Sequence, residues 1–224
     1  KKATYDTDVF TPFIQYIEKV SGKKYTFSYE RDAKSDIAMR VIADHIRAVS
    51  FTIADGQLPD NGGAGYVIRR ILRRAVRYYY SFLNIKEPFL YRLVPMLADQ
   101  FANVFPELKA QQEQVAKIIQ SEEKSFLNTL ENGLRRFANL TAKDGVIAGD
   151  EAFELYDTFG FPIDLTRLMA EEKGWSVDEK GFEKAMQAQK ERGRADAEKT
   201  VGDWTILAPG DVEFVGYDQL EVRK

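Results

Sequence analysis

A run of arginines is the strongest chemical signal in the chain. Its five members, the candidates for binding phosphate, are Arg69, Arg70, Arg73, Arg74 and Arg77. At about 100° per helical residue, the last four share one face and an aliphatic set occupies the other. Arginine offers a planar fork of donors that suits phosphate, so this ridge predicts contact with an RNA backbone or another polyanion. A solvated helix face paired with acidic neighbours would give the same spacing.

The loop before the arginines is rich in turn signals. Asp55-Gly56 and Asn61-Gly62-Gly63 favour positive φ at little steric cost. The loop lacks the lysine and hydroxyl of a P-loop and the third glycine of the dinucleotide fingerprint. A turn-rich connection is therefore the default interpretation. Asn61 nevertheless offers both a donor and an acceptor beside a rigid helix, which makes it a candidate binding residue.

Three carboxylates further along the chain have helical spacing. Glu151, Glu154 and Asp157 lie three residues apart, so they can share one flank of a helix. Ordinary surface charge explains that spacing as well. Asp157 differs from the other two because it ends the expected helix beside Tyr156 and Phe159, which would hold it rigidly.

The remaining polar and aromatic signals favour structural roles. His45 is the only histidine, and a satisfied structural histidine is commoner than a catalytic one. The run from Tyr78 to Tyr80 could stack on bases, but such runs are more often partly core. We therefore predict no catalytic residue in this chain.

Composition excludes several classes of site. The 224 residues are 44% hydrophobic and 30% charged, which suits one large domain or two small ones. The absence of cysteine excludes a disulfide scaffold, a thiolate metal site and a thiol nucleophile, and one histidine excludes a multi-histidine metal site. No apolar run reaches membrane-span length, so we expect a cytoplasmic protein with no membrane partner. With a net charge of −3, a nucleic-acid partner needs a local basic surface.

Helical periodicity dominates the chain. We expect helices over the approximate ranges 11–21, 33–54, 66–83, 88–103, 107–141, 151–158, 163–173 and 178–199. The fold class is therefore all-α, a multi-helix domain with a long central helix, 107–141, plus a short truncated β segment at the C-terminus. Glu122 is the only polar break on the buried face of that central helix, and Gly133 should weaken it by roughly 1 kcal/mol.

The turn at Lys143-Asp144-Gly145 is the best internal boundary. It divides the chain into a first helical region, 1–145, a second helical subdomain, 146–203, and the start of a β-rich segment, 204–224. The β segment is expected from Val212-Glu213-Phe214-Val215 and Leu220-Glu221-Val222.

Several blocks resemble the alanyl-tRNA synthetase family of the bacterial type. They follow the family's order and spread through most of the chain: Tyr5-Asp6-Thr7-Asp8-Val9-Phe10, Asp44-His45-Ile46-Arg47-Ala48, Asp55-Gly56-Gln57-Leu58-Pro59, the stretch 65–77, and Leu155-Tyr156-Asp157-Thr158-Phe159-Gly160-Phe161-Pro162 with the four residues after it. The resemblance places the chain after the class II catalytic core of a longer enzyme and before its editing domain.

The resemblance implies a helical region that holds the acceptor stem of alanine tRNA and recognises its G·U wobble pair. It assigns base reading to Asn61 and Asp157. Two departures from the family pattern are Asp60, where serine is usual and where a carboxylate would repel phosphate, and Ala64, near which a longer basic side chain is common.

The chemistry of the wobble pair fits these two side chains. A-form RNA exposes base edges in its shallow minor groove, where a wobble pair leaves the guanine 2-amino group without a pairing partner. A carboxylate or amide oxygen can accept from that amine, and an amide NH2 can donate to the uracil O2. Nearby arginines would position the stem through its phosphates without reading sequence.

The resemblance further implies an enzyme that joins alanine to its tRNA with ATP and magnesium and carries zinc in a downstream region. We expect none of the ATP, alanine or metal sites among these residues, no catalysis by this part alone, and no DNA partner. The competing hypothesis is a helical protein-interaction adaptor, with the arginine ridge pairing an acidic partner and the long helix as its docking surface.

Overall fold

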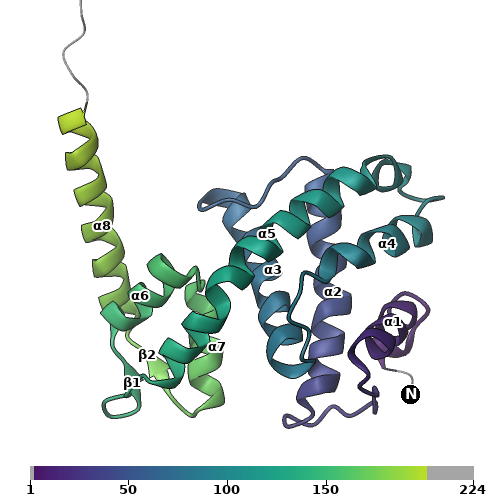
Figure 1. The fold of residues 1–224 in the computed structure, drawn as a ribbon, viewed down its shortest axis with the longest axis horizontal. Coiled ribbons are helices and arrows are strands. Elements are labelled where there is room, and N and C mark those ends of the chain that lie inside the picture. Colours follow the sequence, from purple (N-terminus) through teal and green to yellow (C-terminus); the bar gives the residue numbers. More distant parts are fainter. Residues whose placement is uncertain (1–2, 201–224) are drawn as a thin grey trace, which may run out of the picture. The chain divides into compact units, whose positions relative to one another are not determined.

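The computed structural model of the protein describes residues 3–200, with side chains as far as residue 193. Within these residues the regular structure is mostly helical, as predicted (Figure 1). Residues up to Ala185 form one compact unit. A second unit begins at Met186, and its described part is the continuation of the last helix, α8 (Glu179–Thr200).

The first helices follow the predicted pattern. After a short 3-10 turn, η1 (Thr4–Asp6), come α1 (Thr11–Ser21) and α2 (Lys34–Ala54). Helix α1 ends at Gly22, whose φ of 69° is the left-handed cap that favours glycine. Pro12 lies in the first turn of α1, where its missing N–H costs nothing.

Helix α3 (Gly63–Phe82) carries the arginines and begins earlier than the predicted Tyr66. Its first turn lies directly beneath the preceding loop. A Cβ added to Gly65 would stand 2.5 Å from the Leu58 carbonyl oxygen and 2.7 Å from the Asp60 Cβ. The glycine therefore lets the loop that holds Asn61 fold closely over the start of the helix.

The prediction of one helix over 88–103 is wrong. That segment divides into a 3-10 helix, η2 (Leu90–Leu93), and a short α-helix, α4 (Val94–Gln100). Pro95 is the reason, because proline lacks the N–H that a helix interior requires but is tolerated in the first turn. The structure places Pro95 in the first turn of α4.

Helix α5 (Pro106–Ala138) is the long central helix that the periodicity predicts. It packs against α2, α3 and α4 and then continues to α6 (Figure 1). Its predicted apolar face is fully buried, with Val115, Ile119, Phe126, Leu130 and Phe137 no more than 4% exposed. This helix therefore connects the first group of helices to the second.

The second group of helices is smaller. It contains α6 (Gly149–Phe159) and α7 (Ile163–Glu172), flanked by two short strands, β1 (Val146–Ile147) and β2 (Ser176–Val177). The strands are parallel, with Val146 opposite Ser176 and Ile147 opposite Val177. No sequence signal predicted them, because two residues are too few for a detectable alternation. The predicted β segment over 204–224 lies outside the described residues, and the division at 145 stays a prediction.

A buried carboxylate, Glu123, joins α5 to α3 and η2. It is fully buried and accepts hydrogen bonds from the Tyr79 hydroxyl and from the backbone N–H groups of Phe89, Leu90 and Tyr91, at 2.7–3.1 Å. Burial raises the pKa of Glu123, and these hydrogen bonds oppose that rise. The four donors satisfy a group whose burial alone would be costly.

Gly133 has a packing role that the sequence did not reveal. It lies inside α5, and a Cβ there would stand 2.3 Å from Cε2 of the Phe161 ring and 3.0 Å from the Phe159 Cβ. The missing side chain lets the segment between α6 and α7 approach the α5 backbone.

We predict that Gly133→Ala destabilises the protein, by about 1–3 kcal/mol, because the overpacking outweighs the higher helix propensity of alanine. Gly193→Ala in α8 is the matched control, since a Cβ there has no neighbour within 4 Å. It should cause no loss of stability. Urea unfolding followed by circular dichroism measures both, and a stabilised Gly133→Ala variant would contradict the packing argument.

Candidate nucleic-acid interface

The arginine face of α3 packs against other helices over much of its length. Arg77 is the clearest case, since it is only 5% exposed. Its two terminal nitrogens donate to the two carboxylate oxygens of Glu172 on α7, at 2.9 and 2.6 Å. This two-pronged pairing commits the Arg77 guanidinium to holding α7 against α3.

Arg70 and Arg74 lie beside a second carboxylate of α7. The Arg70 Nε is 3.5 Å from Oδ1 of Asp164. Burial raises the pKa of Asp164, and Arg70 and Arg74 oppose that rise. The Arg70 side chain keeps 40% of its surface exposed, against 15% for Arg69 and Arg73 and 7% for Arg77. Arg70 is thus better placed than these three to reach a partner in solution.

Glu122 binds two arginines of α3 at once. Its carboxylate accepts from Nε and Nη2 of Arg69, at 3.1 and 2.9 Å. The same carboxylate lies 3.8 Å from Nη2 of Arg73. The Glu122 side chain is 18% exposed, so water screens these attractions only in part. The residue that interrupts the predicted apolar face of α5 is therefore the centre of an ionic cluster.

Arg73 links this cluster to the end of α6. Its Nη1 donates to the Gly160 carbonyl oxygen, and its guanidinium lies over the Phe126 ring, 5.1 Å from the centroid. Burial lowers the pKa of Arg73, and Glu122 opposes that effect. An arginine retains its charge in proteins, so a paired carboxylate is needed close by.

Asn61 is held by the same cluster. The Arg69 Nη1 donates to Oδ1 of Asn61, and the Arg69 Nη2 is 3.4 Å from the Pro59 carbonyl oxygen. The backbone N–H of Asn61 donates to Oδ1 of Asp60 at 2.7 Å, so the unusual carboxylate is engaged within its own loop. Asn61 remains exposed. The loop therefore presents an amide whose oxygen is already occupied.

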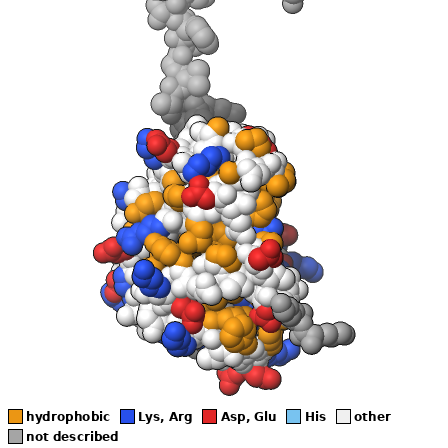
Figure 2. Space-filling model, turned by 90° about the vertical axis from the view of Figure 1, so that its right-hand side faces the viewer, with side chains coloured by type: hydrophobic (Ala, Val, Ile, Leu, Met, Phe, Trp, Pro, Cys, Tyr) orange, Lys and Arg blue, Asp and Glu red, His pale blue; other side chains and the backbone are white. Residues whose placement is uncertain are grey.

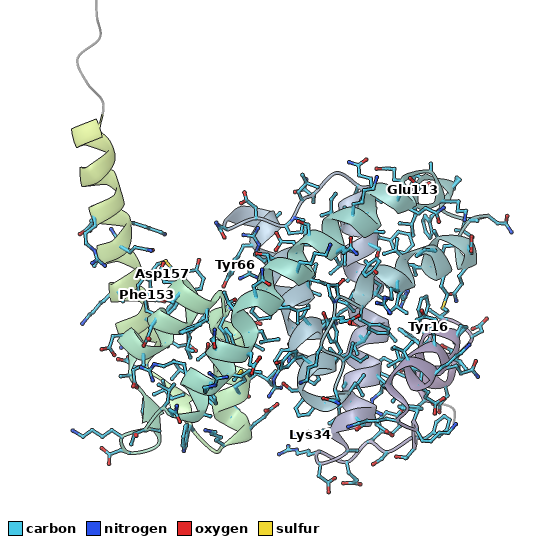
Figure 3. All side chains as sticks on the ribbon, viewed as in Figure 1. Tyr16, Lys34, Tyr66, Glu113, Phe153 and Asp157 are labelled. Carbon is cyan, nitrogen blue, oxygen red and sulfur yellow. The ribbon has the colours of Figure 1, made fainter. Side chains whose placement is uncertain are left out.

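Asp157 lies exposed near the C-terminal end of α6. Figure 3 labels Asp157 on α6 and Tyr66 in the first turn of α3. The end of α6 is joined to α3 by the hydrogen bond from Arg73 to the Gly160 carbonyl oxygen. Helix α6 then ends at Gly160, which adopts a φ of 70° and is bound by Arg73.

The segments that carry the two sequence-predicted base-reading residues come from different parts of the chain and are held by neighbouring turns of α3. Asn61 is bonded to Arg69, and Gly160, shortly after Asp157, is bonded to Arg73 one helical turn further along. Sequence analysis identified Asn61, Asp157 and the arginines, but it did not identify the carboxylates that organise them. The position of Glu122 could have been noticed in the sequence, since it interrupts an apolar face. No sequence pattern indicates the roles of Asp164 and Glu172, because these depend on how α7 docks.

Two of the three tyrosines in the run 78–80 are buried, Tyr80 is half-buried, and the histidine is paired with a neighbouring carboxylate. Tyr78 and Tyr79 are 6% and 0% exposed, so neither ring is available for stacking on a base. His45 is 3.2 Å from the Asp44 carboxylate, and burial lowers its pKa.

The described residues contain no group of three or more His, Cys, Asp or Glu side chains placed to hold a metal ion. Over the same residues, every helix is too short or too polar to cross a membrane.

The chain matches the family model of the class II tRNA synthetases (A) over residues 1–224. The chain belongs to this synthetase family. Among curated relatives, the alanine–tRNA ligase of Cytophaga hutchinsonii is 60% identical over 98% of this chain and 25% of that protein. Those of Flavobacterium psychrophilum and Christiangramia forsetii are 55% and 56% identical, over 99% and 98% of this chain. The chain spans about a quarter of the length of these synthetases.

We predict that the arginines of this synthetase chain differ in their effect on stability. Arg77→Gln should cost about 3 kcal/mol, because it leaves Glu172 without its charge partner in a mostly buried site. Arg70→Gln should change stability by no more than about 1 kcal/mol, since its ion pair is long and its side chain is partly exposed. Urea unfolding of the two variants measures the difference. Equal, small effects would mean that the Arg77 pair does not hold α7 in solution.

Proposed function

We propose that this chain is the acceptor-stem-recognising region of an alanine–tRNA ligase, and that the complete protein acts in the cytoplasm. The proposed reaction joins alanine to its tRNA. An ester cannot form spontaneously from a free carboxylate, so the complete protein would use ATP and magnesium. Family membership and the relatives' names support the reaction, and the geometry around α3 supports the role of this region.

The observation that carries the proposal is that Asn61 and the end of α6, which bears Asp157, are held by neighbouring turns of α3. Asn61 and Asp157 are both exposed, and the two arginines that hold these segments share Glu122. Base reading requires such rigidity, because a hydrogen bond discriminates only when its donor and acceptor cannot adjust to the wrong partner.

The contacts favour different roles for the two residues. A guanidinium has donors only, so the atom of Asn61 that faces Arg69 must be the amide oxygen. The Asn61 NH2 group, which makes no hydrogen bond within the described part of the chain, is then available as a donor to uracil O2. Asp157 is an acceptor when ionised and suits the guanine 2-amino group. Together they match a G·U pair in the minor groove.

The arginines would contribute through phosphates. That all five do so stays a prediction, and the geometry favours Arg70 and Arg74. Arg69, Arg73 and Arg77 would have to leave carboxylates to reach RNA. Arg70 is partly exposed, and the half-buried Arg74 forms no ion pair among the described residues.

The adaptor hypothesis has less support. It needs the long helix as a docking surface, and the predicted apolar face of α5 is buried within the described residues. On the end of the molecule in Figure 2, acidic and basic side chains are interspersed with small hydrophobic areas, so that face has no large area of one charge. No specific observation favours an adaptor over RNA binding.

Base reading can be tested by substitution. In the complete protein, Asn61→Ala and Asp157→Ala should each reduce the preference for a G·U stem over its G·C counterpart, by roughly tenfold to a hundredfold. The loss should fall on charging of the G·U tRNA, because in a G·C pair the guanine amine already bonds cytosine. The measurement is kcat/KM for both tRNAs. Circular dichroism controls for folding, and a double variant that keeps the full G·U preference would refute the assignment.

Phosphate binding can be tested separately. Arg70→Gln with Arg74→Gln should weaken tRNA binding about equally for G·U and G·C stems. Each lost phosphate contact should lower the slope of log K against log salt by roughly 0.7–0.9. Fluorescence anisotropy at several salt concentrations measures the slope. An unchanged slope would show that these two arginines do not contact RNA.

A further inference from the structure

Glu122 occupies an unusual position between the two proposed base-reading residues. Its polar contacts are with arginines of α3. It binds Arg69, which holds Asn61, and lies against Arg73, which holds the end of α6 that carries Asp157. We propose that Glu122 is a positioning residue for base recognition, acting on both residues through Arg69 and Arg73. The proposal rests on the proposed function.

On one side of Glu122, Arg69 fixes the orientation of the Asn61 amide. Bidentate pairing with Glu122 sets the plane of the guanidinium, and the nitrogen that remains, Nη1, then points at Asn61. Since this nitrogen can only donate, it selects the amide rotamer whose oxygen faces inward and whose NH2 faces outward. Without Glu122, Arg69 would lose two of its four acceptors and could turn toward water.

Arg73, the second arginine beside Glu122, fixes the backbone at the end of α6. Arg73 donates to the carbonyl oxygen of Gly160, the left-handed residue at which α6 stops. A Cβ on Gly160 would stand 2.5 Å from the Arg73 Nη1, so guanidinium and backbone fit closely. The orientation of the last turn of α6, and with it Asp157, is therefore tied to Arg73.

A carboxylate is required at position 122 for an electrostatic reason. Arg69 and Arg73 lie one helical turn apart, at the spacing where like charges repel. Both side chains are only 15% exposed, so water screens their repulsion poorly. Glu122 supplies the negative charge that lets both arginines stay in place. In this arrangement the guanidinium of Arg69 is engaged in positioning Asn61.

The decisive experiment is Glu122→Gln in the complete protein, assayed by kcat/KM for charging G·U and G·C tRNAs. We expect the G·U preference to fall by roughly tenfold, close to the effect of losing one base contact, with most of the loss on the G·U tRNA. On an Asn61→Ala background, the same substitution should lower the preference by less, because part of its effect passes through Asn61.

Glu172→Gln is the matched control. It also removes a carboxylate that pairs with an arginine of α3, but Arg77 holds no base-reading group. It should destabilise the protein at least as much as Glu122→Gln and leave the G·U preference unchanged. If both variants lower the preference in proportion to their loss of stability, Glu122 has only a structural role and the proposal is wrong.

Arg69→Lys separates positioning from phosphate binding. Lysine keeps the charge but cannot bind Glu122 with two prongs and Asn61 at the same time. We expect the G·U preference to fall while the salt dependence of tRNA binding stays unchanged. An intact preference would refute the proposal.

The outcomes also separate this proposal from the proposed function. If Asn61→Ala and Asp157→Ala keep the G·U preference, the proposed function itself fails. If those variants lose it while Glu122→Gln and Arg69→Lys keep it, the function stands and only the positioning role is refuted.

Discussion

The structure depends on charged side chains that lie between helices and must find partners there. Glu122 and Glu123 are adjacent on α5 and therefore point in directions about 100° apart. Glu122 meets arginines of α3, whereas Glu123 meets the Tyr79 hydroxyl and three backbone donors around η2. A carboxylate that is shielded from water is tolerated only when such donors are in place. These two residues thus fix the distance and rotation of α3 relative to α5, and the exposed groups follow from that arrangement.

The helices and their buried faces could be predicted from the sequence because they depend on local periodicity. The all-α class, the long central helix and the glycine end of α1 are all confirmed. The error at α4 came from giving apolar spacing more weight than Pro95, although the proline was visible. The role of Gly133 could not be foreseen, since a glycine that weakens a helix and one that admits Phe161 are identical in the sequence.

The candidate site was predictable as a set of residues but not as an arrangement. Arginine spacing on α3 indicates a charged face, and the same spacing serves RNA binding and packing against acidic helices equally well. The arginines of α3 serve both purposes. Arg77 is paired with Glu172 of α7, whereas Arg70 is partly exposed. Which arginines belong to which group depends on the docking of α7, a long-range event with no local signature. A chain of net charge −3 can in this way keep a small basic surface while other arginines of the same helix are paired with carboxylates.

The Tyr79–Glu123 hydrogen bond has a consequence for alkaline conditions. Burial raises the pKa of the Tyr79 phenol, and the adjoining Glu123 raises it further. In the unfolded chain the same phenol ionises near pH 10. The folded state therefore retains a proton that the unfolded state releases, and the stability that this group contributes below pH 10 is lost as the pH rises further. The contact that joins α3 to α5 makes the protein sensitive to base, and ionisation of this tyrosine reports the separation of the two helices.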